Sequence, residues 1–165
     1  MADRIRICFV CLGNICRSPT AEAVMQRLVD DAGLTDHVEV ASAGTAGWHI
    51  GDAPDDRAVA EARRRGIEMT SRGRQFRGAD FERFELVVAM DRSNHQVLAD
   101  LAQRNGDDHP TKVRMLREFA STSPGLHDVP DPYYGGDDGF ATVFDMVEDA
   151  CRNLLDHVRQ QHDLP

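Results

Sequence analysis

Four short stretches of the chain have the length and composition of β-strands. Residues 5–10 and 86–90 are largely apolar, and residues 38–41 and 112–115 form two shorter segments of the same kind. A run that is apolar on both faces is typical of a parallel strand buried between layers of helices. The pattern therefore predicts a parallel sheet covered on both sides.

The segments between these strands carry apolar residues at helical spacing. The segment that follows residue 18 repeats them every three or four positions and closes at Gly33. Further helices are expected over residues 55–65, ended by Gly66, and from a cap at Asp91 or Ser93 to residue 105. The last helix is expected over residues 138–159, and its apolar face comprises Phe140, Val143, Phe144, Val147, Cys151, Leu154, Leu155 and Val158.

Strands alternate with helices along the whole chain, without an internal repeat or a linker. This order predicts an α/β fold in a single domain over residues 1–165. Ligands of such sheets bind at the carboxyl ends of the strands. Cys11, Ser42 and Asp91 each follow directly on a predicted strand, so we expect them to share one edge.

A cysteine and an arginine bracket the loop between the first strand and the first helix. The backbone N–H groups of such a loop, with a helix N-terminus behind it, can hold a doubly charged phosphate. The positive potential of these N–H groups and of the helix N-terminus favours the thiolate form of Cys11. The planar guanidinium of Arg17 can donate to two phosphoryl oxygens. We expect Ser18 to cap a helix starting at Pro19 and to hydrogen-bond to the Cys11 sulfur. The loop residues predicted to bind phosphate are Leu12, Gly13, Asn14, Ile15 and Cys16.

The alternative interpretation of this loop is a structural cysteine beside a surface arginine.

If a thiolate attacks a phosphate ester, an acid must protonate the leaving group. Asp131 is the best candidate in the proline-rich run of residues 129–136, although an Asp-Pro pair also forms turns. The competing carboxylates are Asp128, Asp137 and Asp138, of which the last two also suit helix capping.

Composition and charge restrict the setting of this chemistry. The chain has 165 residues, of which 41% are hydrophobic, and no apolar window long enough to span a membrane. The formal net charge of −9 argues against a nucleic-acid partner. The four cysteines and the absence of a signal segment favour a reducing, cytoplasmic location, with Cys8 and Cys151 as core thiols.

Arginine clusters could add a basic rim to an anion site. The candidates are the run of residues 63–65 and the pair Arg72 and Arg74. The alternative, a solvated surface, is the commoner role of such runs.

The run Val10-Cys11-Leu12-Gly13-Asn14-Ile15-Cys16-Arg17-Ser18-Pro19 resembles the signature loop of the low-molecular-weight protein tyrosine phosphatases, bacterial type. Ser42-Ala43-Gly44-Thr45, Trp48, Met90-Asp91 and Asp131-Pro132-Tyr133-Tyr134-Gly135 follow in the order and approximate spacing of that family, over nearly the whole chain. The resemblance implies a doubly wound fold with a four-stranded parallel sheet and the phosphate-binding loop after the first strand. It also implies a metal-free, cofactor-free enzyme acting on tyrosine-phosphorylated proteins, which we expect to be a monomer.

The resemblance assigns further roles to particular residues. It favours Asp131 as the general acid and then the general base. It implies that Asn14 adopts a left-handed backbone held by the Ser42 side chain, where the alternatives are a simple turn and a strand-end hydroxyl. Trp48, expected to be exposed, would form the substrate walls with Tyr133 and Tyr134, although a loop tryptophan is as often a core residue.

The chain departs from the family at one position. Many members carry a histidine in the segment after the second helix, where this sequence has Ser71. A hydrogen-bond network built on that histidine near Asp91 is therefore in doubt, and His49 is a candidate substitute.

Three other functions use the same residues. Phosphoarginine hydrolysis occurs in relatives with a smaller, hydroxyl-bearing residue at the position of Ile15, so Ile15 favours tyrosine. Arsenate reduction needs two further relay cysteines, and Cys8 and Cys151 are not paired in a mobile segment. A phosphotyrosine-binding module would need neither the thiol nor the acid. Cys16 also suggests that a reversible disulfide protects an oxidised Cys11.

Overall fold

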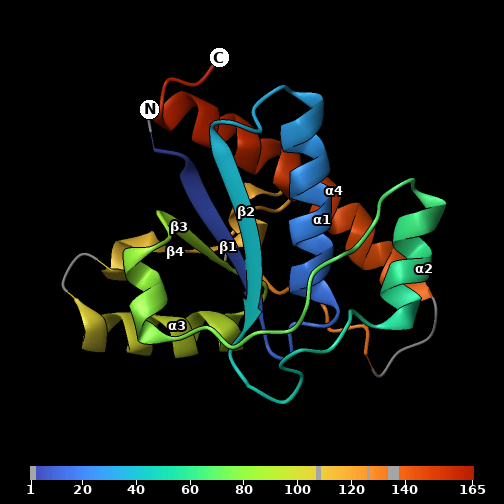
Figure 1. Ribbon diagram of the computed structural model, residues 1–165, viewed down its shortest axis with the longest axis horizontal. Coiled ribbons are helices and arrows are strands. Elements are labelled where there is room, and N and C mark those ends of the chain that lie inside the picture. The colour runs from blue at the N-terminus through green and yellow to red at the C-terminus, as the bar shows by residue number, and fades with distance from the viewer. Residues whose placement is uncertain (1–2, 107–108, 126, 134–137) are drawn as a thin grey trace.

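The computed structural model describes residues 3–106, 109–125, 127–133 and 138–165. The strands form one parallel sheet in the order β2-β1-β3-β4 (Figure 1). The strands are β1 (Ile5–Cys11), β2 (Val38–Gly44), β3 (Leu86–Ala89) and β4 (Val113–Met115). The long helices are α1 (Arg17–Asp31), α2 (Asp56–Arg64), α3 (Arg92–Asn105) and α4 (Asp138–Gln161). This arrangement confirms the predicted doubly wound α/β fold with four parallel strands.

Helices cover both faces of the sheet because alternate residues of its central strand are buried on opposite sides. Ile7 and Phe9 of β1 belong to the core shared with α1 and α4. Cys8 and Val10 belong to a second core, shared with α3 and the 3₁₀ helix η1 (Gly78–Glu82). Figure 1 shows α1 and α4 on one side of the sheet and α3 on the other. A strand flanked in this way must be apolar where both faces are covered, as β1 is from Ile7 to Cys11.

The carboxyl ends of the first three strands meet at one edge. In the register of the sheet, Cys11 lies opposite Gly44 and Val10 lies opposite Ala89. The loop after β1, the segment after β2 and the N-terminus of α3 therefore lie together. This is the edge at which the sequence predicts the site.

The structure differs from the sequence prediction most clearly at the end of β2 and in its short helices. β2 continues to Gly44 rather than ending at Ala41, because the residues from Ser42 to Gly44 pair with the end of β1. The chain also forms short 3₁₀ helices that lack a periodic signal, at Gly78–Glu82, His109–Lys112 and Leu116–Phe119. Within the described ranges, no helix has the length and apolar character needed to cross a bilayer.

Candidate active site

The loop after β1 curls around the sulfur of Cys11. Cys11 ends β1 and is 3% exposed. Its Sγ atom lies 2.9 Å from the Ser18 hydroxyl and accepts a hydrogen bond from the Asn14 N–H at 3.3 Å. These contacts stabilise an anion on sulfur, because each can point a proton at it. The hydrogen bond predicted between Ser18 and Cys11 is therefore present.

Asn14 fixes the shape of this loop. Its φ angle is 59°, in the left-handed region that costs most residues about 1 kcal/mol or more. Its side-chain amide donates to Ser18 Oγ at 2.8 Å and Ser42 Oγ at 3.0 Å, and its oxygen accepts from the Arg74 N–H at 3.0 Å. These bonds offset the backbone strain. The φ angle and the bond to Ser42 confirm the left-handed conformation and the Ser42 contact expected from the family resemblance.

Ser18 does not cap the helix, contrary to the prediction. Helix α1 begins at Arg17, and the residue at its N-cap position, Cys16, makes no side-chain cap hydrogen bond. The Ser18 hydroxyl instead lies among Cys11 Sγ, the Asn14 amide and, at 3.3 Å, the Ala43 carbonyl. It is unavailable for capping because the loop uses it to hold the thiol.

Gly44 allows the loop to lie directly on the end of β2. A Cβ atom added at Gly44 would meet the Leu12 carbonyl oxygen at 2.8 Å and the Ala46 carbonyl oxygen at 3.0 Å. The Thr45 N–H donates to the Cys11 carbonyl at 2.9 Å, so the two chains are joined at this point. Any larger residue at position 44 would displace backbone, which explains the glycine in Ser42-Ala43-Gly44-Thr45.

The hydrogen-bond chain behind the thiol ends at Glu22. The Ser42 hydroxyl donates to Glu22 Oε1, so the chain runs from Cys11 through Ser18, Asn14 and Ser42 to this carboxyl group. Burial raises the pKa of Glu22, and the hydrogen bond from Ser42 and the Arg74 charge only partly oppose this effect. The sequence gave no indication of this role, because Glu22 occupies an ordinary position on an amphipathic helix.

Replacing Glu22 with glutamine is expected to stabilise the protein increasingly as the pH rises. When folding raises the pKa of a carboxyl group, the protein loses stability as the pH rises from the unfolded pKa of that group to its higher folded pKa. Glutamine keeps an oxygen that accepts from Ser42 but carries no charge, so the variant avoids this loss. Thermal unfolding from about pH 4 to about pH 8 should show a widening difference in Tm. The exposed Glu68→Gln is the control, and a difference independent of pH would contradict the explanation.

Arg17 is buried at the centre of the site and held by acceptors from two other segments. It is 3% exposed, and its Nη1 atom donates to Asp91 Oδ2 at 2.6 Å and the Val129 carbonyl at 3.0 Å. Its Nη2 atom lies 3.5 Å from Asp131 Oδ2. Burial lowers the pKa of Arg17, but the neighbouring Cys11 and the hydrogen-bonded Asp91 outweigh it and raise the pKa overall. The guanidinium is thus charged and fixed in orientation.

Asp91 connects the arginine to the third helix. It is the N-cap of α3, where its Oδ1 atom accepts from the Asn94 N–H at 2.7 Å while Oδ2 accepts from Arg17. This confirms the first of the two predicted caps. The candidate substitute His49 instead pairs with Asp52, at 3.0 Å.

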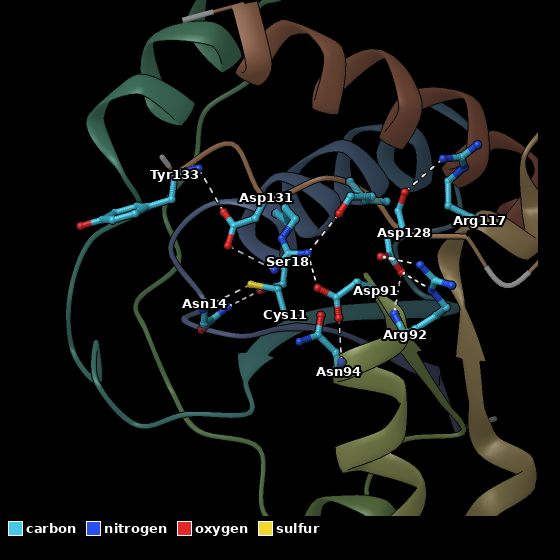
Figure 2. A network of polar contacts seen from close by, with 12 residues as sticks. Cys11, Asn14, Ser18, Asp91, Arg92, Asn94, Arg117, Asp128, Asp131 and Tyr133 are labelled. Atoms are coloured by element: carbon cyan, nitrogen blue, oxygen red, sulfur yellow. Dashed lines mark hydrogen bonds and ion pairs between the residues drawn. The ribbon is translucent and has the colours of Figure 1, made fainter. Parts of the chain in front are cut away.

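The segment that carries Asp131 is anchored beside the loop. The Val129 N–H donates to the Met90 carbonyl at 2.8 Å, and Arg92 binds the Asp128 carboxylate. Asp131 Oδ1 accepts from the Tyr133 N–H at 3.0 Å (Figure 2). Of the competing carboxylates, Asp128 is thus held by Arg92, Asp138 starts α4, and Asp137 lies outside the described residues.

Cys11, Arg17 and Asp131 line one cavity of about 140 Å³. Its lining residues are Cys11, Leu12, Gly13, Ile15, Cys16, Arg17, Trp48, His49, Asp131 and Tyr133. Asn14, Ser18 and Ser42 lie behind the thiol, as described above. Tyr134, also predicted to bind substrate, lies outside the described residues.

The floor and the mouth of the cavity differ in character. Cys11 and Arg17 are each 3% exposed, whereas Trp48 is 72% exposed and Leu12 and Tyr133 are each 40% exposed. The exposure predicted for Trp48 is confirmed. The cavity therefore combines a charged, buried floor with an apolar rim, which suits an anion attached to an aromatic group.

The candidate arginines do not form a basic rim around this cavity, in line with the commoner role of such runs. Arg65 is paired with Glu61 and Asp145, Arg74 with Asp80, and neither lines the cavity. Among the lining residues, the arginine is Arg17. The positive charge in this cavity comes from this buried side chain.

All four cysteines are free thiols. Cys8 and Cys151 are fully buried, as predicted for core thiols, and burial raises the pKa of each. Burial also raises the pKa of Cys16, to about 12. Cys16 lines the same cavity as Cys11. Both are free thiols, and the protective disulfide between them stays a prediction.

Residues 6–164 match the family model described as low molecular weight phosphotyrosine protein phosphatase. A low molecular weight protein-tyrosine-phosphatase of Streptomyces coelicolor is 48% identical over 157 residues, covering 94% of each chain.

Solved phosphatase structures have the same fold as this chain. A protein tyrosine phosphatase from Entamoeba histolytica, with Hepes in its active site, superposes with a TM-score of 0.89 at 39% identity, covering 95% of this chain and 98% of that one. A Drosophila arginine phosphatase superposes with a TM-score of 0.87 at 30% identity, covering 94% and 98%. The chain belongs to the low molecular weight phosphotyrosine protein phosphatase family.

Proposed function

We propose that this protein is a protein-tyrosine phosphatase that works through a cysteinyl-phosphate intermediate, with Cys11 as nucleophile, Arg17 as phosphate-binding residue and Asp131 as general acid. The observation that carries the proposal is the convergence of these three side chains on one cavity. The substrate is a tyrosine-phosphorylated protein, and the proposed setting is a monomer in the cytoplasm, where free thiols persist.

In the first step, the Cys11 thiolate attacks phosphorus and the bond to the phenolic oxygen breaks. Asp131 gives its proton to that oxygen, so tyrosine leaves in its neutral form. Ser18 and the Asn14 N–H, which contact Sγ, stabilise the thiolate before attack. The N–H groups of the loop from Leu12 to Cys16 and the Arg17 guanidinium bind the phosphoryl oxygens.

In the second step, water attacks the cysteinyl phosphate and the sulfur–phosphorus bond breaks. Asp131, now a carboxylate, takes a proton from the water, and the thiolate is restored as inorganic phosphate forms. Asp91 and the Val129 carbonyl keep the Arg17 guanidinium in place throughout, because both accept from its Nη1 atom. The phosphoryl group is therefore held by the same guanidinium in both steps, while Asp131 changes its protonation state between them.

The depth of the thiolate favours tyrosine. Cys11 is almost fully buried beneath an exposed rim that includes Trp48 and Tyr133. A phosphorylated phenol is long enough to reach the floor while its ring contacts these aromatic walls. A phosphoserine ester is too short to do so, since its backbone would meet the rim first.

The proposal is tested by phosphate release from matched peptides carrying phosphotyrosine, phosphoserine or phosphoarginine. We expect turnover of the phosphotyrosine peptide with kcat/KM at least about 10²-fold above the other two. Ile15 in the cavity wall is the reason for expecting little phosphoarginine hydrolysis. A preference for phosphoarginine, the activity named for the Drosophila structure, would reassign the substrate. Binding without turnover would indicate a recognition module.

A further inference from the structure

We propose that Arg57 is a positioning residue that holds the Asp131 segment over the cavity by joining it to the phosphate-binding loop. The inference rests on the proposed role of Asp131 as general acid. The links of this connection are Ile15, Asp55, Arg57, Tyr133 and Asp131, and its two ends lie in the wall of the same cavity.

The first part of the connection joins the loop to Arg57. The Asp55 N–H donates to the Ile15 carbonyl at 2.8 Å, so Asp55 is anchored to the loop by its backbone. The Asp55 carboxylate caps α2 and binds the Arg57 guanidinium through both oxygens, with Nε and Nη2 each at 3.1 Å. A bidentate pair of this kind fixes the guanidinium in its plane.

The Asp55 carboxylate is well suited to this role. Its side chain is 12% exposed. Burial raises the pKa of Asp55, but the hydrogen bonds from Arg57 outweigh that effect and lower the pKa overall. The pair thus stays ionised around neutral pH.

The second part joins Arg57 to the acid. Arg57 Nη2 donates to the Tyr133 carbonyl at 2.9 Å, while the guanidinium carbon lies 5.7 Å from the centroid of the Tyr133 ring and 4.7 Å from that of Phe140. The N–H of the same Tyr133 donates to Asp131 Oδ1 at 3.0 Å. Arg57 therefore fixes the residue whose backbone orients the carboxylate (Figure 2 shows the Tyr133–Asp131 contact).

Arg57 matters most when phosphate is bound. Asp131 also forms an ion pair with Arg17 Nη2, at 3.5 Å, and a bound phosphoryl group competes for that guanidinium. The contact with the Tyr133 N–H does not face this competition. The opposite end of the segment has its own anchors, at Asp128 and Val129, so losing Arg57 should loosen the acid without dismantling the phosphate site.

The test compares kcat/KM of Arg57→Ala for phenyl phosphate and p-nitrophenyl phosphate, because kcat/KM reports the step in which the phenol leaves. Nitrophenol leaves with little help, whereas phenol depends on a well-placed acid. We expect Arg57→Ala to lower kcat/KM for phenyl phosphate about 10-fold more than for p-nitrophenyl phosphate. In an Asp131→Ala background, where no acid remains to be positioned, the same substitution should add no loss that depends on the leaving group.

Three variants serve as controls. Arg64→Ala removes an exposed arginine from the same helix, where its partner is Glu61, and should match the parent on both substrates. Arg57→Lys keeps the charge but loses the planar fork, so its loss should be intermediate. Asp55→Asn keeps a good helix cap while weakening the grip on Arg57, and it should reproduce the selective loss even if Arg57→Ala folds poorly.

Equal losses on the two substrates, or a selective loss that persists without Asp131, would overturn the positioning role. The proposed function fails in a different way. If Asp131→Ala itself lost no more activity on phenyl phosphate than on p-nitrophenyl phosphate, the general acid would be another group. The two failures are therefore distinguishable in one set of measurements.

Discussion

Replacing Cys11 with serine is expected to abolish turnover, with kcat/KM for a phosphotyrosine peptide falling about 10⁴-fold or more. The Sγ atom lies against the Ser18 hydroxyl and the Asn14 N–H, which stabilise an anion. These groups do not act as a base that could deprotonate a serine hydroxyl. A serine at position 11 would therefore remain a neutral alcohol, which is a poor nucleophile at phosphorus.

The same variant should still bind the substrate. Arg17 and the loop N–H groups are unchanged by the substitution, and serine is close to cysteine in size. Titration calorimetry should give a Kd of the variant for the phosphotyrosine peptide that lies within about 10-fold of the Kd of the parent protein for phosphate. This measurement checks the folding of the variant as well as the mechanism. Turnover at the parent's rate would refute the nucleophilic role of Cys11.

Replacing Arg17 with lysine should be nearly as damaging, although the charge is kept. We expect kcat/KM to fall about 10³-fold, the scale on which an arginine that stabilises a phosphoryl transition state contributes. Arg17 Nη1 serves both Asp91 and the Val129 carbonyl, while Nη2 lies on the Asp131 side of the cavity. A lysine ammonium is a single point charge and cannot hold the two sides at once.

The matched control is Arg6→Lys at the opposite end of the sheet. Arg6 forms an exposed ion pair with Glu39 at 3.2 Å, and such pairs are worth little to stability or activity. Thermal unfolding of both variants separates catalytic loss from misfolding, since Asp91 is left with a poorer partner in Arg17→Lys. Activity of Arg17→Lys within about 10-fold of the parent would show that charge alone suffices at this position.

Local patterns were enough to predict most of the fold. The strands β1 and β3 are apolar because both faces are covered, and such runs are visible without any knowledge of their partners. The apolar stripe in the last part of the chain predicts a helix over residues 138–159, and α4 runs from Asp138 to Gln161 with this stripe buried.

The errors arose where contacts distant in sequence override local preference. Ser18 has the chemistry of a helix cap, but Cys11, Asn14 and Ala43 use its hydroxyl instead. The end of β2 is set by its pairing with β1, which a short polar segment does not reveal.

The sequence predicts those site residues that lie close together in one motif. Cys11, Arg17 and Asn14 stand within seven residues of one another, whereas Glu22 and Arg57 act through partners that folding brings close. Arg57 contacts Tyr133, 76 residues away, and neither residue signals the other in the sequence. Residues of this second kind become visible only when the packing of the segments is known.

The contrast between floor and mouth has a consequence for retargeting the enzyme. The floor of the cavity is built from backbone and buried side chains that hold one another, whereas Leu12, Trp48 and Tyr133 project at the entrance with large exposed areas. Substitutions at Leu12 and Trp48 can therefore change which peptides are accepted while the chemistry beneath them stays the same. In this architecture, substrate preference can change while the catalytic residues stay the same.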